Sequence, residues 1–588
     1  MDAIDTNKLK YIKYINWILF YILSSSLLWY DKPIGTAVFT QKDYVLLIGI
    51  AISLFMIVSS IFFNCRIKFS SIDVLVFLLF IYSIMRFSVL SFRDDSLVKL
   101  LIYIMLYFTL RQYKYDQADA KIYVISQGFF GVIISFFSVF NFINSELSFP
   151  SNFSYSFANS GIMANYLVIS YILTFNSFFI ASFKNQWLKF LFLSLILIQV
   201  LAIILSGSRT AWISTNIISI IVFYKHYDLK AIFRKNVIII LLPFIFLVRQ
   251  LTQFKYFSFL GRLLIYKVSL KAISAAFLIG YGIDSFSSVY NLKQAQYFGV
   301  KNLVDNEWFV ADSMKNACSD FVQYFFELGF IGIALILAIL YVLINKIQRS
   351  SNINGDSQSI FLALLGVIIC GCFSYPLQEL TICLISVFFF TLIVNSLEYD
   401  EREVSVSASR VINIVMGGFL VLLFLISCDI IALKKQWSET IKNSPKKGFD
   451  KNQYETLYLG LKHNKIFLYN YGCELSKAGR YSESIKVIDE AIKKTVDEKL
   501  LCFQAENYYQ INRFVDAEQA YFSACNMVPS RFFPKYFLMV FYINTRSNQK
   551  AIDIGKKILE MPEKKRDNQS IQIKLSTEFL IDSLTKIK

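Results

Sequence analysis

The stretch Leu195-Ile-Leu-Ile-Gln-Val-Leu-Ala-Ile-Ile-Leu-Ser-Gly-Ser-Arg-Thr-Ala211 joins a long apolar run to a short polar turn that carries an arginine. A second junction of this kind is Glu327-Leu-Gly-Phe-Ile-Gly332, which leads into another apolar run. Apolar runs of about 15–25 residues fit the roughly 30 Å core of a bilayer. Both stretches therefore predict the ends of membrane-spanning helices with polar side chains at the membrane boundary.

The rest of the chain repeats this pattern. Of its 588 residues, 56% are hydrophobic and only 17% are charged, which is more apolar surface than a soluble protein could bury. We expect an all-α, polytopic helical membrane bundle of about 12–13 spans. The predicted spans are about 11–30, 43–63, 71–91, 97–110, 121–143, 162–183, 187–205, 210–224, 236–249, 324–345, 359–375, 377–396 and 411–433. The first run has no small-residue cleavage site before Pro33, so we expect a retained anchor.

The net charge of +17 does not indicate nucleic-acid binding, because the basic residues cluster in alternate short loops between the spans. The loop 144–161 has no Lys or Arg, whereas 184–189, 225–235 and 346–349 are basic. The positive-inside rule then predicts a cytoplasmic N-terminus. The turn at 206–209 and a long polar segment, about 250–323, would both lie on the outer face.

After residue 433 the composition becomes charged and helical, and the sequence repeats. Gly479 and Ala491 have counterparts 33 residues on at Asn512 and Ala524. Stacked helical hairpins bury a shared core through small residues at such positions. The pattern resembles tetratricopeptide repeats (TPR), about three of them over 464–562. We therefore expect a membrane domain, 1–433, and an extracytoplasmic repeat domain, 434–588, which serves either as a stability cap or as a binding surface.

Polar residues from distant parts of the chain gather on the predicted outer face. Four of them are spaced i, i+4, i+7 and i+11, which would form one helical stripe facing a cavity rather than lipid. Arginines at this depth suit phosphate oxygens, although snorkelling at the interface is the alternative for each one taken alone. The candidates are Asn159, Ser206, Ser208, Arg209, Arg262, Lys267, Tyr281, and the stripe Asn316, Asp320, Gln323 and Glu327. They predict a phosphate-linked lipid substrate and an acceptor that must be deprotonated.

The nine cysteines show no paired spacing, and the chain has only two histidines, His226 and His463. We predict no metal site and no cofactor.

Several short motifs occur in an order that resembles the O-antigen ligase and polymerase superfamily. They are Phe157-Ala-Asn-Ser-Gly161 with Ala164-Asn-Tyr-Leu167, Ser206-Gly-Ser-Arg-Thr-Ala211, Gly261-Arg262, Gly280-Tyr-Gly282, Asp320-Phe-Val-Gln323 leading to Glu327-Leu-Gly-Phe-Ile-Gly332, and Tyr375-Pro376. The resemblance covers about 150–400, and more loosely all the spans.

The resemblance implies a metal-independent GT-C-type membrane glycosyltransferase in a bacterial inner membrane. It would move a glycan from undecaprenyl pyrophosphate to an acceptor at the periplasmic face, as in lipopolysaccharide biosynthesis. Arg209 and Arg262 would hold the pyrophosphate and stabilise it as it leaves. The acceptor could be a lipid core, a growing glycan or a protein hydroxyl, so ligase, polymerase and protein O-oligosaccharyltransferase remain alternatives. The repeat tail slightly favours a ligase or a protein acceptor, and it could bind a protein partner.

One motif departs from the family. Many ligases carry His-Asn before the Asp-x-x-Gln segment, whereas this chain has Cys318 and Ser319. A thiol of ordinary pKa is a poor base for a sugar hydroxyl. Either Asp320 or Glu327 is the base, or the reaction depends mainly on the arginines, or activity has been lost; we favour one of the first two.

Two readings from other classes remain. One is a transporter of lipid-linked sugars. Such transporters usually have interrupted helices and charges near mid-membrane, whereas these spans are almost free of charge, which disfavours this interpretation. A non-catalytic assembly scaffold, with the tail as its working part, is the third possibility.

Overall fold

The computed structural model describes residues 41–586 except 89, 114–116, 145–156, 158, 182–184, 227–255, 301–305, 351–354, 398–401, 448 and 565–567, together with a few positions between 14 and 25. This part of the chain is all-α apart from one pairing of two-residue strands, β1 (Lys68–Phe69) with β2 (Arg402–Glu403). The predicted span 236–249, and most of 11–30, lie outside the described residues.

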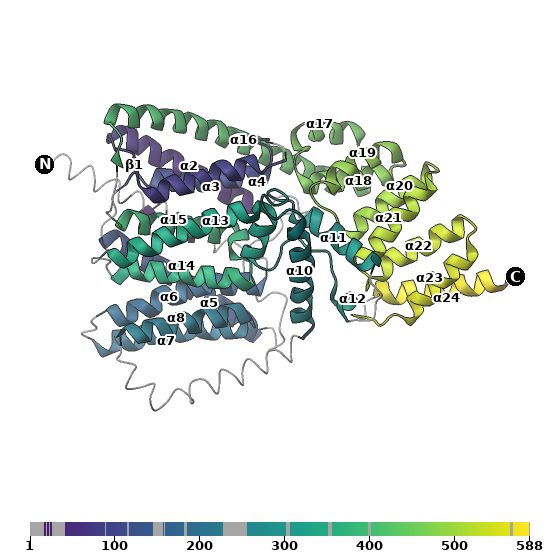
Figure 1. Ribbon diagram of the computed structural model, residues 1–588, viewed down its shortest axis with the longest axis horizontal. Coiled ribbons are helices and arrows are strands. Elements are labelled where there is room, and N and C mark those ends of the chain that lie inside the picture. The colour runs from purple at the N-terminus through teal and green to yellow at the C-terminus, as the bar shows by residue number, and fades with distance from the viewer. Residues whose placement is uncertain are drawn as a thin grey trace.

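In the described part of the chain, eleven helices form a bundle, which is seen on the left of Figure 1. They are α2 (Gln41–Phe62), α3 (Ser71–Met85), α4 (Asp95–Leu110), α5 (Gln117–Asn144), α6 (Ser160–Ile180), α7 (Gln186–Leu205), α8 (Arg209–His226), α13 (Asp320–Arg349), α14 (Gly355–Phe373), α15 (Leu380–Ser396) and α16 (Val406–Lys447). Each coincides with a predicted span. Seven of them, α2, α5, α6, α7, α13, α14 and α16, are long and apolar enough to cross a membrane. The predicted all-α, multi-pass membrane bundle is confirmed.

Helix α6 is the most enclosed of these spans, packed against α5, α7, α8 and α14. Several of its polar side chains bond to neighbouring elements. Asn176 Nδ2 donates to Ser359 Oγ at 2.7 Å, and Tyr166 Oη donates to Gln127 Oε1 at 2.9 Å. Inside an apolar bundle such bonds fix the register of adjacent helices, because an unpaired polar group there is costly.

A buried ion pair ties α3 to α4 near the end of the bundle where β1 lies. Arg111 Nε is 3.0 Å from Asp73 Oδ1, and Tyr107 Oη donates to the same oxygen at 2.6 Å. The two charged side chains are 3% and 0% exposed, so each is the main compensation for burying the other.

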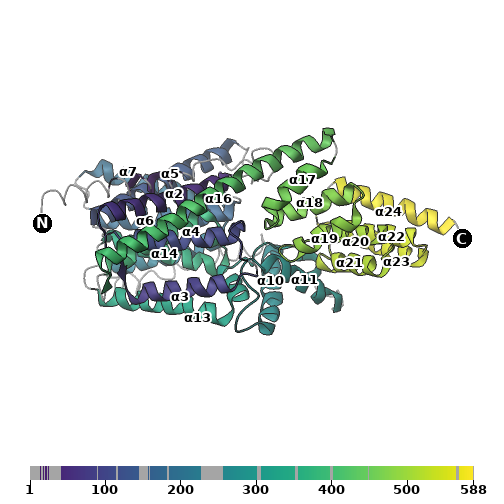
Figure 2. The same cartoon turned by 90° about the horizontal axis from the view of Figure 1, so that it is seen from above.

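The segment predicted as a long polar loop is a folded helical cap. It contains α10 (Tyr256–Ala275), α11 (Phe286–Val300) and the short α12 (Glu307–Val310). Helix α10 lies across the ends of the bundle helices (Figures 1 and 2). Buried residues of α10 and α11, such as Leu264 and Tyr290, share a core with Phe326 of α13.

Helix α13 is interrupted at Gly329, whose φ of 65° and ψ of −167° are not helical. Residues 277–282 cross its backbone at this point: Gly282 N donates to Glu327 O at 2.9 Å and Phe330 N to Phe277 O at 2.8 Å. A Cβ on Gly280 would lie 2.5 Å from Glu327 O. We call this contact of 277–282 with 326–331 the glycine crossing. It gives Gly329 a backbone role in addition to the helix packing that small residues usually serve in membranes.

The C-terminal region is a series of helices on the right of Figure 1. They are α17 (Lys451–Leu461), α18 (Lys465–Lys477), α19 (Tyr481–Ile492), α20 (Glu498–Gln510), α21 (Phe514–Met527), α22 (Phe532–Asn544), α23 (Asn548–Glu560) and α24 (Asn568–Lys586). The closest pairs are α18 with α19, α20 with α21, and α22 with α23. Ala505, Ala517 and Ala551 are fully buried in these hairpins. Helical hairpins were predicted, and their assignment to tetratricopeptide repeats stays a prediction.

The repeat region packs firmly on the rest of the molecule. Helix α16 continues without a break through the predicted boundary at 433/434, and Trp437 on it is buried in one core with Tyr454 and Phe467. From the other side, Asn291 Nδ2 of α11 donates to Val496 O at 2.8 Å, and Gln294 Nε2 donates to Met527 O at 2.6 Å. The tail therefore has a fixed position over one end of the bundle.

Candidate active site

The turn between α7 and α8 is built by its serines. Ser206 Oγ donates to Ile203 O at 2.6 Å and accepts from Ser208 N at 3.2 Å, while Gly207 between them has φ of 62°. Ser208 Oγ accepts from Ala211 N at 3.4 Å, which caps the start of α8. Both serines are buried, so the structure gives these two predicted substrate-binding residues a role in shaping the turn.

The turn places Arg209 at the first residue of α8. The positive end of the helix dipole disfavours a cation there, so Arg209 is not explained by helix stability. An arginine at the positive end of a helix dipole makes a region that attracts anions.

Arg262 reaches the same region from α10. Its Nη1 donates to Phe373 O at 2.9 Å, and burial together with the nearby positive charge of Arg262 lowers the pKa of the Arg209 guanidinium. Two like charges held close together, partly removed from water, indicate a site for an anion. The sequence prediction that these arginines converge is consistent with this geometry.

The segment 373–378 forms the floor beside the arginines, and α6 and α13 hold it. Asn159 Nδ2 donates to Tyr375 Oη at 3.1 Å, and Asn165 Nδ2 donates to Ser374 Oγ at 2.9 Å. On its other side, Leu377 N donates to Asp320 Oδ2 at 3.0 Å. Asp320 is buried and fixes this segment, and Asn159 also caps α6 through Ile162 N.

Only three of the four residues predicted to form one helical stripe lie on α13. Helix α13 begins at Asp320, with Ser319 as its cap, and Cys318 before it has φ of 56°. Asn316 therefore lies in the preceding loop, and its placement on the helix was wrong because the backbone turns at Cys318. Gln323 Nε2 donates to Glu327 Oε1 at 3.1 Å, so the last two members do share a face.

A pocket of about 660 Å³ lies between the bundle and the repeat region. Asn316, Gln323 and Glu327 all line it, although Asn316 reaches it from the loop. Neither arginine is among its lining residues, but the segment 373–378 borders both regions: Phe373 O accepts from Arg262, while Leu377 and Gln378 line the pocket. The site thus has two compartments, a basic one and a pocket that contains a carboxylate.

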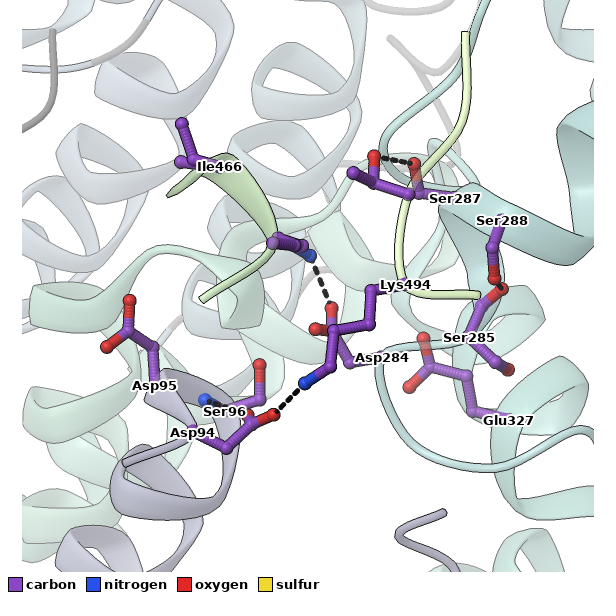
Figure 3. Close-up of polar contacts among 12 residues, drawn as sticks. Asp94, Asp95, Ser96, Asp284, Ser285, Ser287, Ser288, Glu327, Ile466 and Lys494 are labelled. Carbon is purple, nitrogen blue, oxygen red and sulfur yellow. Dashed lines mark hydrogen bonds and ion pairs between the residues drawn. The ribbon is translucent and has the colours of Figure 1, made fainter. Parts of the chain in front are cut away.

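The pocket also brings together charged residues that were not among the site residues predicted from the sequence. Lys465 Nζ from α18 is 2.6 Å from Asp284 Oδ1, and Lys494 Nζ from the repeat region is 2.7 Å from Asp94 Oδ2 at its edge (Figure 3). Asp284 follows the Gly280-Tyr-Gly282 motif and could have been found from it. Nothing in the local sequence shows that Lys465, almost 200 residues on, reaches it.

Two further predicted residues have local partners. Lys267 Nζ pairs with Glu307 Oε1 at 2.7 Å and its side chain is 53% exposed. Tyr281 Oη donates to Ala272 O at 2.9 Å, and its ring lies 4.9 Å from that of Phe326. Tyr281 therefore supports the glycine crossing.

Cys318 and Ser319 occupy the places where many ligases carry His-Asn. Burial raises the pKa of the Cys318 thiol, which makes it a still poorer base at neutral pH. Ser319 Oγ donates to Gly371 O at 3.1 Å and joins α13 to α14. Among the described residues, no group of three or more His, Cys, Asp or Glu is placed to hold a metal ion.

Comparison with protein families identifies the segment that carries this site. Residues 190–337 match the O-antigen ligase family. The chain carries an O-antigen ligase domain. This domain includes Arg209, Arg262, Asp320, Glu327 and the glycine crossing, so the arrangement described here lies largely inside it. No curated protein and no solved structure matches the chain.

Proposed function

We propose that this protein transfers a glycan from an undecaprenyl-pyrophosphate carrier to an acceptor at the periplasmic face of the inner membrane, as an O-antigen ligase does. The observation that carries the proposal is the approach of Arg209 to Arg262 at the start of α8, inside the O-antigen ligase domain. Two guanidinium groups offer forked donors to the oxygens of a diphosphate.

The arginines would act on the leaving group. An acceptor hydroxyl attacks the anomeric carbon, the bond from that carbon to the diphosphate oxygen breaks, and negative charge develops on the diphosphate. Fixed positive groups aimed at developing charge lower the barrier most. The resemblance implies that no metal ion is needed for this step, and transfer measured in EDTA tests that directly.

Glu327 is the better candidate for the base. Both carboxyl groups are buried, but Glu327 lines the pocket, whereas Asp320 lies under the segment 373–378 and accepts a backbone N–H from it. In the proposed reaction Glu327 takes the proton of the acceptor hydroxyl. Asp320 acts as a positioning residue that fixes the segment 373–378 where the two compartments meet.

Glu327→Gln is expected to lower kcat for transfer by roughly a hundredfold, the lower end of what a general base contributes. Binding of the lipid-linked donor should change little, because Gln keeps the shape and the bond to Gln323. Single-turnover transfer in reconstituted vesicles measures this. Glu403→Gln, which alters a half-exposed carboxylate at the opposite end, should leave transfer unchanged. Full activity of Glu327→Gln would show that Glu327 is not the general base.

The orientation has its own test. A membrane-impermeant maleimide added to intact cells should label Asn306→Cys in the large loop above the wild-type background. It should not label Arg402→Cys at the opposite end until the membrane is opened. Both positions are exposed. The reverse pattern would place the arginines and the repeat region on the cytoplasmic side.

We assign the tail to the tetratricopeptide type, from the spacing of its hairpins.

A polymerase or a protein O-oligosaccharyltransferase would use the same donor chemistry, and the family match suits a ligase or a polymerase. Incubating the reconstituted protein with a lipid-linked oligosaccharide and lipid, glycan or peptide acceptors separates the three activities by product. A product-free movement of the donor across the bilayer would instead indicate a transporter, and activity lost only on tail deletion would favour a scaffold.

A further inference from the structure

The pocket of about 660 Å³ is long and has two different ends. Along α4 its lining runs from Asp95 to Tyr107, twelve residues, which at the rise of an α-helix is about 18 Å. Charged and amide groups lie at the end near the repeat region. The far end is lined by Val76, Leu79, Phe80, Leu100, Ile104, Ile336, Val387 and Phe390.

The polar end is unsuited to a diphosphate. Asp94, Asp95 and Asp284 are each paired with a lysine, namely Lys494, Lys434 and Lys465, and Glu327 and Lys99 also line this end. Positive and negative charges are therefore balanced, and this end lacks the excess of positive charge that would attract a diphosphate. Carboxylate and amide oxygens accept hydrogen bonds, and sugar hydroxyls are the donors that match them.

The repeat region supplies part of this mouth. His463, Asn464, Lys465 and Ile466 line the pocket from the start of α18. Burial alone would lower the pKa of Lys465, but the carboxylate of Asp284 outweighs it and the pKa is raised, so the ammonium group stays charged. The pocket is therefore completed only when the tail is docked.

We propose that this pocket binds the acceptor of the reaction, and that the acceptor is a neutral sugar carried on a single apolar chain. The chain lies between α3, α4, α13 and α15, and the sugar hydroxyls face Asp284 and Glu327, with the docked tail closing the mouth. The identification of the occupant as the acceptor depends on the function proposed above, whereas its amphiphilic chemistry depends on the lining alone. A volume of this size is in the usual range for a pocket that binds one small ligand.

Photolabelling tests the binding without requiring transfer. The full-length protein in phospholipid vesicles is exposed to dodecyl maltoside with a diazirine in its alkyl chain. We expect saturable labelling of α4 and α15 that falls at least fivefold in Ile336→Trp, which fills the apolar end. Leu337→Trp, at the adjacent lipid-facing position, should label like wild type. Non-saturable labelling, or equal labelling of the two variants, overturns the proposal.

Kinetics identify the occupant. Ile336→Trp should raise KM for a lipid-linked sugar acceptor at least tenfold and leave KM for the donor unchanged, while Leu337→Trp changes neither. A rise in the donor KM instead would show that the pocket holds the donor's chain and would overturn the assignment to the acceptor. Saturable labelling with no transfer by wild type would contradict the proposed function and leave the amphiphile site standing.

Lys465→Ala tests the contribution of the tail. We expect it to raise the acceptor KM at least fivefold without changing kcat, and Lys465→Arg to restore most of the loss, since Arg can keep the pair with Asp284. An unchanged acceptor KM in a folded Lys465→Ala protein would show that the tail does not contribute to acceptor binding.

Discussion

Replacing Arg209 and Arg262 together with alanine is expected to lower kcat/KM for glycan transfer by at least about a thousandfold. Removing one preorganised donor from a developing charge typically costs about 10²–10³ in rate. Here both charges would be lost from one compartment, to which they are contributed by two different helices, α8 and α10.

Single variants separate the contribution of the positive charge from that of the forked donors. Arg209→Lys keeps the charge but loses the forked donors, so we expect it to recover only part of the rate. Arg66→Ala, a half-exposed arginine that pairs with Glu403 at the other end of the bundle, is the matched control and should transfer normally. Initial rates with a lipid-linked oligosaccharide, at equal protein levels in vesicles, provide the measurement. Unchanged transfer by a well-folded double variant would show that the two arginines do not stabilise the leaving diphosphate, and the proposed mechanism would be wrong.

Gly280→Ala is expected to destabilise the protein by about 2–5 kcal/mol, from a backbone held at φ of 68° and from overpacking against a backbone that cannot move aside. The added Cβ would lie 2.5 Å from Glu327 O and 2.6 Å from Gly329 N. Gly329→Ala meets the same contact from the other side, with Leu278 O at 2.5 Å. Both changes push on the residue that we assign as the base, so transfer should fall with stability.

Thermal unfolding in detergent, followed by loss of monodisperse protein, measures this effect. Gly418→Ala is the control: a Cβ there would meet nothing within 4 Å, and Ala favours the interior of α16 by up to about 1 kcal/mol. We expect Gly418→Ala to match or exceed wild type, and the two crossing variants to unfold at clearly lower temperature. Wild-type stability of Gly280→Ala would mean that the crossing is looser than the structure shows.

The bundle was predictable because its signal is local. A run such as Leu195–Leu205 needs only its own composition to specify a helix in lipid, and the resulting α7 ends at Leu205, directly before the predicted turn. The order of short motifs also predicted the two arginines. The start of α13 was less predictable, because a single residue, Cys318 with positive φ, decides where the helix begins.

The sequence by itself determined the all-α membrane bundle and the helical hairpins of the tail, since each depends on periodicity, whereas the roles of Arg209 and Arg262 stay predictions. Only the tertiary structure decided that residues 277–282 cross α13 at Gly329, that Asp284 meets Lys465, and that the tail closes an amphiphilic pocket. These contacts join residues about 50 to 370 positions apart in the chain. Their partners are chosen by packing of whole helices, and no local pattern encodes that choice.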